Sequence, residues 1–232
     1  MPRLPCSADA HGWRRTALRK ARHRQVRPLP HAFTSTHGAR LQRWTAIFSD
    51  LFGSFLEHLG PAIYEGIYDP GSKPSDSNGF RKDVLNEIRQ LGVPIVRYPG
   101  GNFVSGYNWL DGVGPRANRP RVLDKAWNSI ESNQFGTNEF MAWCKAAGTL
   151  PLMGLNLGSG TAEEAAALVE YCNVEKGTKW SDLRRQHGIA DPYKVQHWCL
   201  GNEMDGPWQD RPYVCHRTRS KSGRCGAADA LR

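Results

Sequence analysis

A short apolar run that ends in acids is the clearest chemical feature of the sequence. The stretch HWCLGNEMDGPW, residues 197–208, passes from apolar side chains into Asn202, Glu203 and Asp205 and then breaks at Gly206. A buried strand that delivers a carboxylate at its end holds that acid rigidly, and apolar walls favour its protonated form. Trp198, Met204 and Trp208 are available as such walls. Glu203 is therefore a candidate general acid, with helix capping or pairing with an arginine as the structural alternative.

Other polar side chains stand at corresponding places along the chain, directly after apolar runs. They are Glu57 and His58, Arg97, Asn102, Asn156, and Asn202 with Glu203. Arg97 needs a carboxylate nearby, and Glu57 is the predicted partner, either in a site or in a purely structural ion pair. Trp109 and Trp127 could offer the flat faces on which sugar rings stack, or they could be core residues. His58, His187 and His197 show no ligand spacing and are interpreted as structural.

These residues need elements to position them, and the apolar pattern predicts four strands and three helices. The strands are expected in the first half of 47–60 and within 93–101, 150–158 and 194–203, and the helices at 79–92, 137–148 and 161–173. Ser77 or Asn78 is the expected cap of the first helix and Gly92 its end, and Thr161 with Glu164 forms a capping box. The stretch between 101 and 137 is expected to be a long loop.

Apolar runs this continuous, alternating with helices, indicate parallel βα units, in which the loops after the strands carry the chemistry. Four units fit half of an eight-stranded barrel or most of an open doubly wound sheet, and the pattern does not choose between them. No G-x-G-x-x-G run follows the first strand. The glycine-rich GLNLGSG stretch at 154–160 lacks the spacing and the lysine of a phosphate loop.

The net charge of +9 is concentrated at the two ends of the chain. Residues 1–45 hold ten basic residues and one acidic residue, whereas residues 46–209 hold fifteen basic and nineteen acidic ones. The basic arm could bind RNA or a membrane surface or act as a transit peptide, but it lacks the interleaved aromatics of a base-stacking surface. We expect no membrane segment and no nucleic-acid partner.

Six cysteines, at positions 6, 144, 172, 199, 215 and 225, include no C-x-x-C pair and no cluster with zinc spacing. Reduced thiols in a cytoplasmic protein are the default interpretation. No metal and no cofactor is expected.

Several long stretches together resemble a known family. They are LFGSFLEHLG, AIYEGIYDP, GFRKDVLNEIRQLGVPIVRYPGGNFVSGYNWLDGVGP, AWNSIESNQFGTNEFM, LVEYCN, WSDLRRQHG and WCLGNEMDGPWQ. In this order they resemble the amino-terminal half of the catalytic domain of a glycoside hydrolase family 51 α-L-arabinofuranosidase, a retaining enzyme. The likeness runs nearly continuously from about residue 48 to residue 209.

The resemblance implies a (β/α)8 TIM-type barrel, of which about the first four βα units are present. It also implies cleavage of terminal α-L-arabinofuranosyl groups from arabinan and arabinoxylan oligosaccharides and polysaccharides. Glu203 of GNE would be the acid/base and Asn202 a ligand of the sugar beside the scissile bond. Glu57 and Asn102 would contact sugar hydroxyls, Arg97 would brace the carboxylates, and Trp127 would line the pocket.

Retention also requires a carboxylate nucleophile, which the family carries on strand seven of the barrel. We therefore expect an inactive fragment, with residues 1–45 a basic arm, 46–209 the partial catalytic domain and 210–232 a divergent tail. In that tail the likeness is lost and returns at AADALR, as after a shifted reading frame. Relatives of full length are expected to be homo-oligomers, an expectation that does not extend to this chain. The alternative function is non-catalytic binding of carbohydrate or nucleic acid.

Overall fold

The computed structural model describes residues 49–206 as a continuous segment. The predictions on the basic arm, on the divergent tail and on Trp208 lie outside the described residues. Within this segment no helix is long and apolar enough to cross a membrane.

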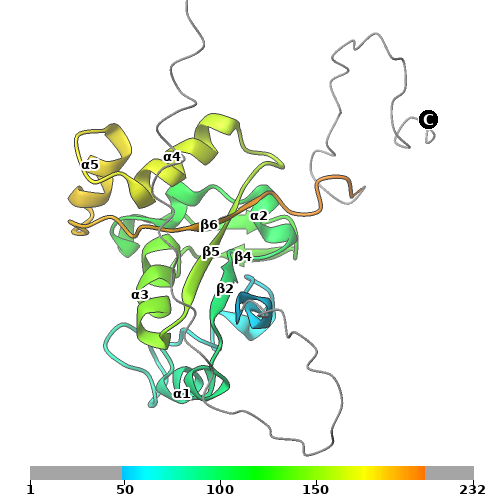
Figure 1. Cartoon of the computed structure of the whole chain (residues 1–232). Coiled ribbons are helices and arrows are strands. Elements are labelled where there is room, and N and C mark those ends of the chain that lie inside the picture. The colour runs from blue at the N-terminus through cyan, green and yellow to red at the C-terminus, as the bar shows by residue number, and fades with distance from the viewer. Residues whose placement is uncertain (1–48, 207–232) are drawn as a thin grey trace, which may run out of the picture. The chain divides into compact units, whose positions relative to one another are not determined.

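A four-stranded parallel sheet forms the centre of the described segment (Figure 1). Its strands are β1 (Ser54–Phe55), β2 (Ile95–Tyr98), β5 (Leu150–Leu155) and β6 (His197–Leu200). They lie in the order β1-β2-β5-β6, and all three pairings are parallel. The order in space follows the order in the chain with no reversal, as in a barrel, whereas a doubly wound sheet reverses at a switch point. The predicted parallel βα units are confirmed.

Within residues 49–206 five α-helices accompany the sheet, and the three predicted ones are among them. They are α1 (Lys82–Leu91), α2 (Asn102–Gly106), α3 (Thr137–Ala147), α4 (Ala162–Asn173) and α5 (Lys179–Gln186). Short 3-10 turns stand at Ser49–Phe52, Gly60–Ala62, Trp109–Gly112 and Arg116–Asn118. The capping box of α4 is confirmed, because the backbone N–H of Glu164 donates to the Thr161 hydroxyl and Thr161 N–H donates to the Glu164 carboxylate.

Two predictions about helix and strand starts are wrong. Neither Ser77 nor Asn78 caps α1, which begins at Lys82 after Arg81 without a side-chain cap. The preceding segment is instead a turn, in which the Asp76 carboxylate accepts the N–H groups of Asn78 and Phe80. The first half of 47–60 is not a strand either: its described part is the 3-10 turn Ser49–Phe52, and strand pairing starts only after Gly53.

The stretch predicted as a long loop contains a helix and a hairpin. Helix α2 follows β2 directly, and β3 (Val122–Asp124) pairs antiparallel with β4 (Ser129–Glu131). Figure 1 shows α2 and the hairpin beyond the carboxyl end of β2, and α1 near its amino end. The hairpin was missed because its outward residues Leu123 and Ile130 are apolar and its inward residues are acidic, the reverse of the usual pattern.

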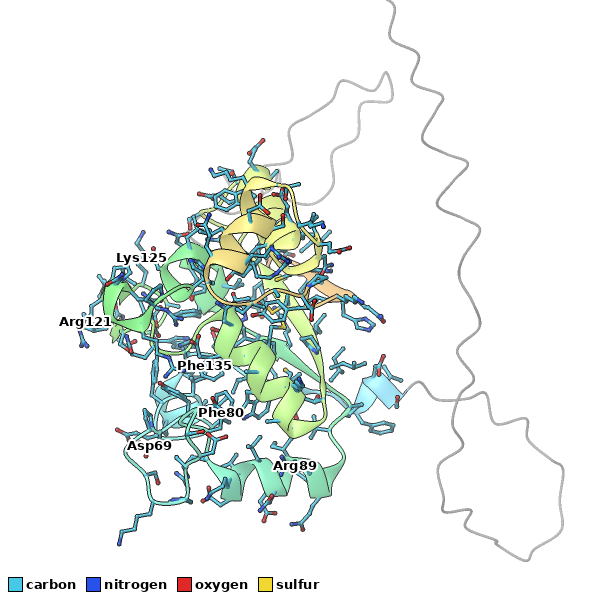
Figure 2. All side chains as sticks on the ribbon, turned by 90° about the vertical axis from the view of Figure 1, so that its left-hand side faces the viewer. Asp69, Phe80, Arg89, Arg121, Lys125 and Phe135 are labelled. Carbon is cyan, nitrogen blue, oxygen red and sulfur yellow. The ribbon has the colours of Figure 1, made fainter. Side chains whose placement is uncertain are left out.

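An aromatic core packs α3 and the segment between the hairpin and α3 against the sheet. Tyr98 of β2 stacks on Phe140 of α3 with ring centroids 4.5 Å apart, and Phe135 meets Tyr98 and Phe80 at 5.8 and 6.4 Å. Figure 2 shows Phe80 and Phe135 pointing inward, whereas Arg121 and Lys125 project outward from the hairpin region. These ring contacts therefore hold the carboxyl end of β2 rigidly against α3 and Phe135.

Candidate active site at the carboxyl ends of the strands

Glu57 lies two residues beyond β1, and its carboxylate is buried and fixed by two donors. Its Oε1 accepts the backbone N–H of Phe103 in α2 and the indole Nε1–H of Trp127 at the tip of the hairpin, both at 3.1 Å. The side chain is only 8 % exposed. Three separate segments thus converge on one carboxylate.

Gly100 allows the loop after β2 to pass close to Glu57. Its φ of +129° lies in a region that favours glycine, and a Cβ there would stand 2.2 Å from Glu57 Cγ. The sequence PGG after the second strand is therefore required by the close approach of the backbone to this carboxylate.

A second chain of hydrogen bonds joins the ends of β2 and β6. The Arg97 Nη2–H donates to Asn202 Oδ1 at 2.9 Å, and Asn202 Nδ2–H donates to Asn102 Oδ1 at 3.1 Å. Arg97 also lies over the ring of Phe55 at 4.9 Å. Because Asn102 begins α2 and the next residue holds Glu57, helix α2 connects both chains of contacts.

The predicted pairing of Arg97 with Glu57 is wrong: within residues 49–206 no ion pair joins them. The Arg97 side chain extends from β2 past the neighbouring strand β5 and contacts Asn202 after β6 instead. Its Nε is buried and has no hydrogen-bond partner among the described residues. The guanidinium fixes the Asn202 amide so that oxygen faces Arg97 and nitrogen faces Asn102.

Glu203 stands at the end of β6 in an unusual backbone conformation. Its φ is +45° and that of Gly201 is +81°, so the chain turns sharply as it leaves the strand. The turn closes through Gly206 N–H to the Glu203 carbonyl at 2.7 Å, which leaves Asp205 exposed in the turn. The prediction that Trp198 walls this carboxyl is wrong, because Glu203 is exposed and Trp198 packs against the core.

The two tryptophans considered as sugar platforms differ in exposure. Trp127 is 39 % exposed beside Glu57. Trp109 is buried, donates to the Glu164 carbonyl and packs on Tyr171 and Trp180. Trp109 is therefore a core residue and not a platform.

A buried polar cluster, missed in the sequence, lies directly behind Glu57. His58 Nδ1 is 2.8 Å from Glu131 Oε2, and the other carboxylate oxygen accepts the Tyr64 hydroxyl and the Asn133 N–H. Burial alone would raise the pKa of Glu131, but the contacts with His58, Tyr64 and Asn133 hold it below its usual value. Burial and the neighbouring carboxylate raise the pKa of Tyr64. Only the long-range packing of the hairpin reveals this cluster.

The remaining polar groups of the strand ends are structural. Asn156 Oδ1 accepts the N–H groups of Gly158, Ser159 and Gly160, so it shapes the glycine-rich loop rather than a ligand site. A cavity of about 120 Å³ behind this loop is lined by Tyr107, Trp109 and their neighbours and includes none of the candidate catalytic or sugar-binding residues. In the described part of the chain no group of three His, Cys, Asp or Glu side chains could hold a metal ion.

Comparison with known proteins shows which family the chain belongs to. Residues 87–219 match the family model of the α-L-arabinofuranosidase 1 domain. The chain is 56 % identical over 180 residues to the intracellular exo-α-(1->5)-L-arabinofuranosidase 1 of Bacillus subtilis, covering 78 % of this chain and 35 % of that protein. The chain thus spans about a third of the length of such curated relatives.

Solved structures agree with the sequence match. A family 51 α-L-arabinofuranosidase from Bifidobacterium longum superposes with a TM-score of 0.70 at 49 % identity, over 72 % of this chain and 33 % of that one. The α-L-arabinofuranosidase of Thermotoga maritima, solved as an arabinose complex, gives 0.69 at 48 % identity, over 70 % and 34 %. The chain belongs to the α-L-arabinofuranosidases of glycoside hydrolase family 51, and its parallel sheet is part of their (β/α)8 barrel.

Proposed function

We propose that this chain supplies the amino-terminal half of the catalytic barrel of a retaining α-L-arabinofuranosidase. The observation that carries the proposal is the convergence of Glu57, Arg97, Asn102, Trp127 and Asn202 in connected hydrogen bonds beside Glu203. All of them stand at or beyond the carboxyl ends of parallel strands, where barrel enzymes carry their chemistry.

Glu203 is the proposed acid/base. It protonates the glycosidic oxygen as the bond to the anomeric carbon breaks, and it then removes a proton from the water that releases the sugar. Asn202, held by Arg97 and Asn102, presents a fixed amide next to this carboxyl. Glu57 accepts sugar hydroxyls on the oxygen that its two donors do not occupy, and Trp127 covers the same sugar.

The proposed reaction needs a second carboxylate about 5 Å from the acid/base. Glu57 is unsuited to attack the anomeric carbon, because the Phe103 N–H and the Trp127 indole already stabilise its charge and fix its direction. In the family the nucleophile comes from strand seven. A polypeptide of these 232 residues alone is therefore proposed to bind arabinofuranosides with little or no hydrolysis.

The substrate class and location follow from the relatives. The Bacillus subtilis and Acetivibrio thermocellus relatives are named intracellular exo-α-(1->5)-L-arabinofuranosidases. The proposed partners are accordingly arabinofuranosyl-containing oligosaccharides and polysaccharides, with terminal residues removed in the cytoplasm.

The test combines this chain with the part of the barrel that it does not contain. The carboxyl-terminal part of the Bacillus subtilis relative, expressed separately, is mixed with the 232-residue chain, and release of nitrophenol from nitrophenyl α-L-arabinofuranoside is measured. We expect hydrolysis by the mixture only, abolished by Glu203→Gln and retained by Glu87→Gln on the exposed face of α1. Hydrolysis by the 232-residue chain alone, lost in Glu203→Gln, would contradict the proposed need for a second half.

A further inference from the structure

The segment that carries Glu57 is attached to the β3–β4 hairpin at two points. On the side of the candidate active site, Trp127 at the hairpin tip donates to Glu57. On the buried side, His58 meets Glu131 of β4 at 2.8 Å. Two consecutive residues therefore hold the tip and the base of the same hairpin.

The inner attachment is fully buried and has its geometry fixed on both sides. His58 and Glu131 are 7 % and 3 % exposed. One Glu131 oxygen is occupied by Tyr64 and Asn133, which leaves the other for His58 Nδ1. Nδ1 and Oε2 are at ion-pair distance, although the ring N–H is not aligned with that oxygen as a hydrogen bond requires.

The imidazole is held as firmly as the carboxylate. His58 Nε2 lies 3.1 Å from the Tyr98 hydroxyl, which is also hydrogen-bonded to the Phe135 carbonyl. The ring stacks on Phe103 with centroids 4.3 Å apart. Phe103 is the residue whose N–H binds Glu57, so the imidazole supports both donors to that carboxylate.

We propose that the His58–Glu131 pair is a positioning device that holds the β3–β4 hairpin so that Trp127 stays bonded to Glu57. Neither residue is exposed to substrate, and both act through Trp127. The outward side chains of the hairpin, Leu123 and Ile130, are 62 % and 57 % exposed, so its inward contacts, this pair among them, must hold it. The consequence for sugar affinity rests on the proposed function, whereas the consequence for the hairpin does not.

The first experiment needs neither substrate nor activity. An asparagine amide stands where Nδ1 stands and a glutamine amide where Nε2 stands, so His58→Asn keeps a donor for Glu131 and His58→Gln keeps only the contact with Tyr98. Backbone hydrogen exchange is measured in the 232-residue chain for residues 122–131, together with the Trp127 indole N–H resonance, assigned through Trp127→Phe. Ile130→Thr, on the outward face of β4, is the control.

We expect His58→Gln to raise exchange in the hairpin about tenfold and to shift the indole resonance, with α3 and β5 unchanged, because the anchor is lost locally. His58→Asn and Ile130→Thr should stay near the wild type. Equal exchange in His58→Gln and wild type, or a rise spread equally over α3 and β5, would overturn the proposal. If His58→Gln does not fold, Tyr64→Phe, which removes one of the two donors to Glu131 Oε1 and leaves the Asn133 N–H in place, must raise hairpin exchange in the same direction.

The second experiment tests whether the pair acts through Trp127. Affinity for an arabino-oligosaccharide is measured for wild type, His58→Gln, Trp127→Phe and the double variant. We expect His58→Gln to weaken binding about fivefold in the wild type, no more than Trp127→Phe itself, and less than about twofold in the Trp127→Phe background, since coupled residues are not additive. Additive losses would show a merely structural role. Absence of any sugar binding would refute the proposed function and leave the exchange result to decide the positioning.

Discussion

Glu57 and Trp127 are seventy positions apart in the sequence and meet in a 3.1 Å hydrogen bond from the indole Nε1 to the carboxylate Oε1. The same oxygen accepts the Phe103 N–H, so two donors from separate segments fix the carboxylate. In the proposed function the opposite oxygen is the one that accepts sugar hydroxyls. The affinity of the site for sugar should therefore depend on an indole that lies on a separate hairpin.

Trp127→Phe keeps the aromatic face and removes the donor to Glu57. We expect affinity for an arabinofuranoside to fall by about 1 kcal/mol, roughly fivefold in Kd, because one hydrogen bond to a charged acceptor is lost at a half-exposed position. Isothermal titration of the 232-residue chain measures the change. Trp180→Phe on α5 is the matched control and should bind as the wild type does.

Arg97→Lys keeps the charge and removes the planar fork that orients Asn202. A lysine ammonium cannot both lie over Phe55 and make the 2.9 Å contact to Asn202 Oδ1 as the planar guanidinium does, so the amide is free to rotate. We expect arabinofuranoside affinity to drop about tenfold with the unfolding midpoint changed little. Unchanged affinity in this variant would show that Arg97 does not order the site. Arg89→Lys, on exposed α1, serves as the control.

Much of the fold was predictable because its elements are locally encoded. The capping box of α4, the left-handed Gly92 after α1 and the apolar run of β5 each depend on residues close together in the chain. The same holds for the placement of Glu57, Asn102 and Asn202 after strands. Local periodicity reports these features directly.

What could not be predicted depends on contacts between distant segments. The Glu57–Trp127 bond, the Arg97–Asn202 contact and the His58–Glu131 pair each join residues at least seventy positions apart. The burial of Trp109 could not be predicted either, because the sequence around a loop tryptophan does not indicate whether a distant helix such as α4 packs over it. Pairings of this kind are set by the register of the barrel and not by local pattern.

Gly100→Ala should disturb the site more than an ordinary glycine substitution. The new Cβ would collide with Glu57 Cγ, and the φ of +129° is itself strained for alanine, so we expect a stability loss of about 1–3 kcal/mol. Arabinofuranoside affinity should fall with it, because Glu57 must move. Gly148 has a φ of +79°, and a Cβ added there would meet no atom within 4 Å. The variant Gly148→Ala should therefore lose stability but keep its affinity for arabinofuranoside.

Arg184 should be among the most important stabilising side chains of the described fold. It is fully buried and donates to the carbonyls of Tyr171, Val174, Glu175 and Ile189 around the end of α4. Arg184→Met leaves these acceptors unpaired, and we expect a loss of about 3 kcal/mol or more in the free energy of unfolding. Arg185→Met removes an exposed arginine with one such contact and should change stability by less than about 0.5 kcal/mol. Urea denaturation compares the two.

Glu131 should make stability depend on acid pH. Its pKa is lowered in the folded state, so the ionised carboxylate contributes stability that is fully present above its ordinary pKa of 4.5 and is lost as pH falls through the lower folded value. Glu131→Gln lacks this titration while other carboxylates titrate alike in both proteins. The difference in unfolding free energy between wild type and Glu131→Gln should therefore shrink from about pH 5.5 to about pH 3. A difference that stays constant or widens over that range would mean that the carboxylate is not held ionised by His58, Tyr64 and Asn133.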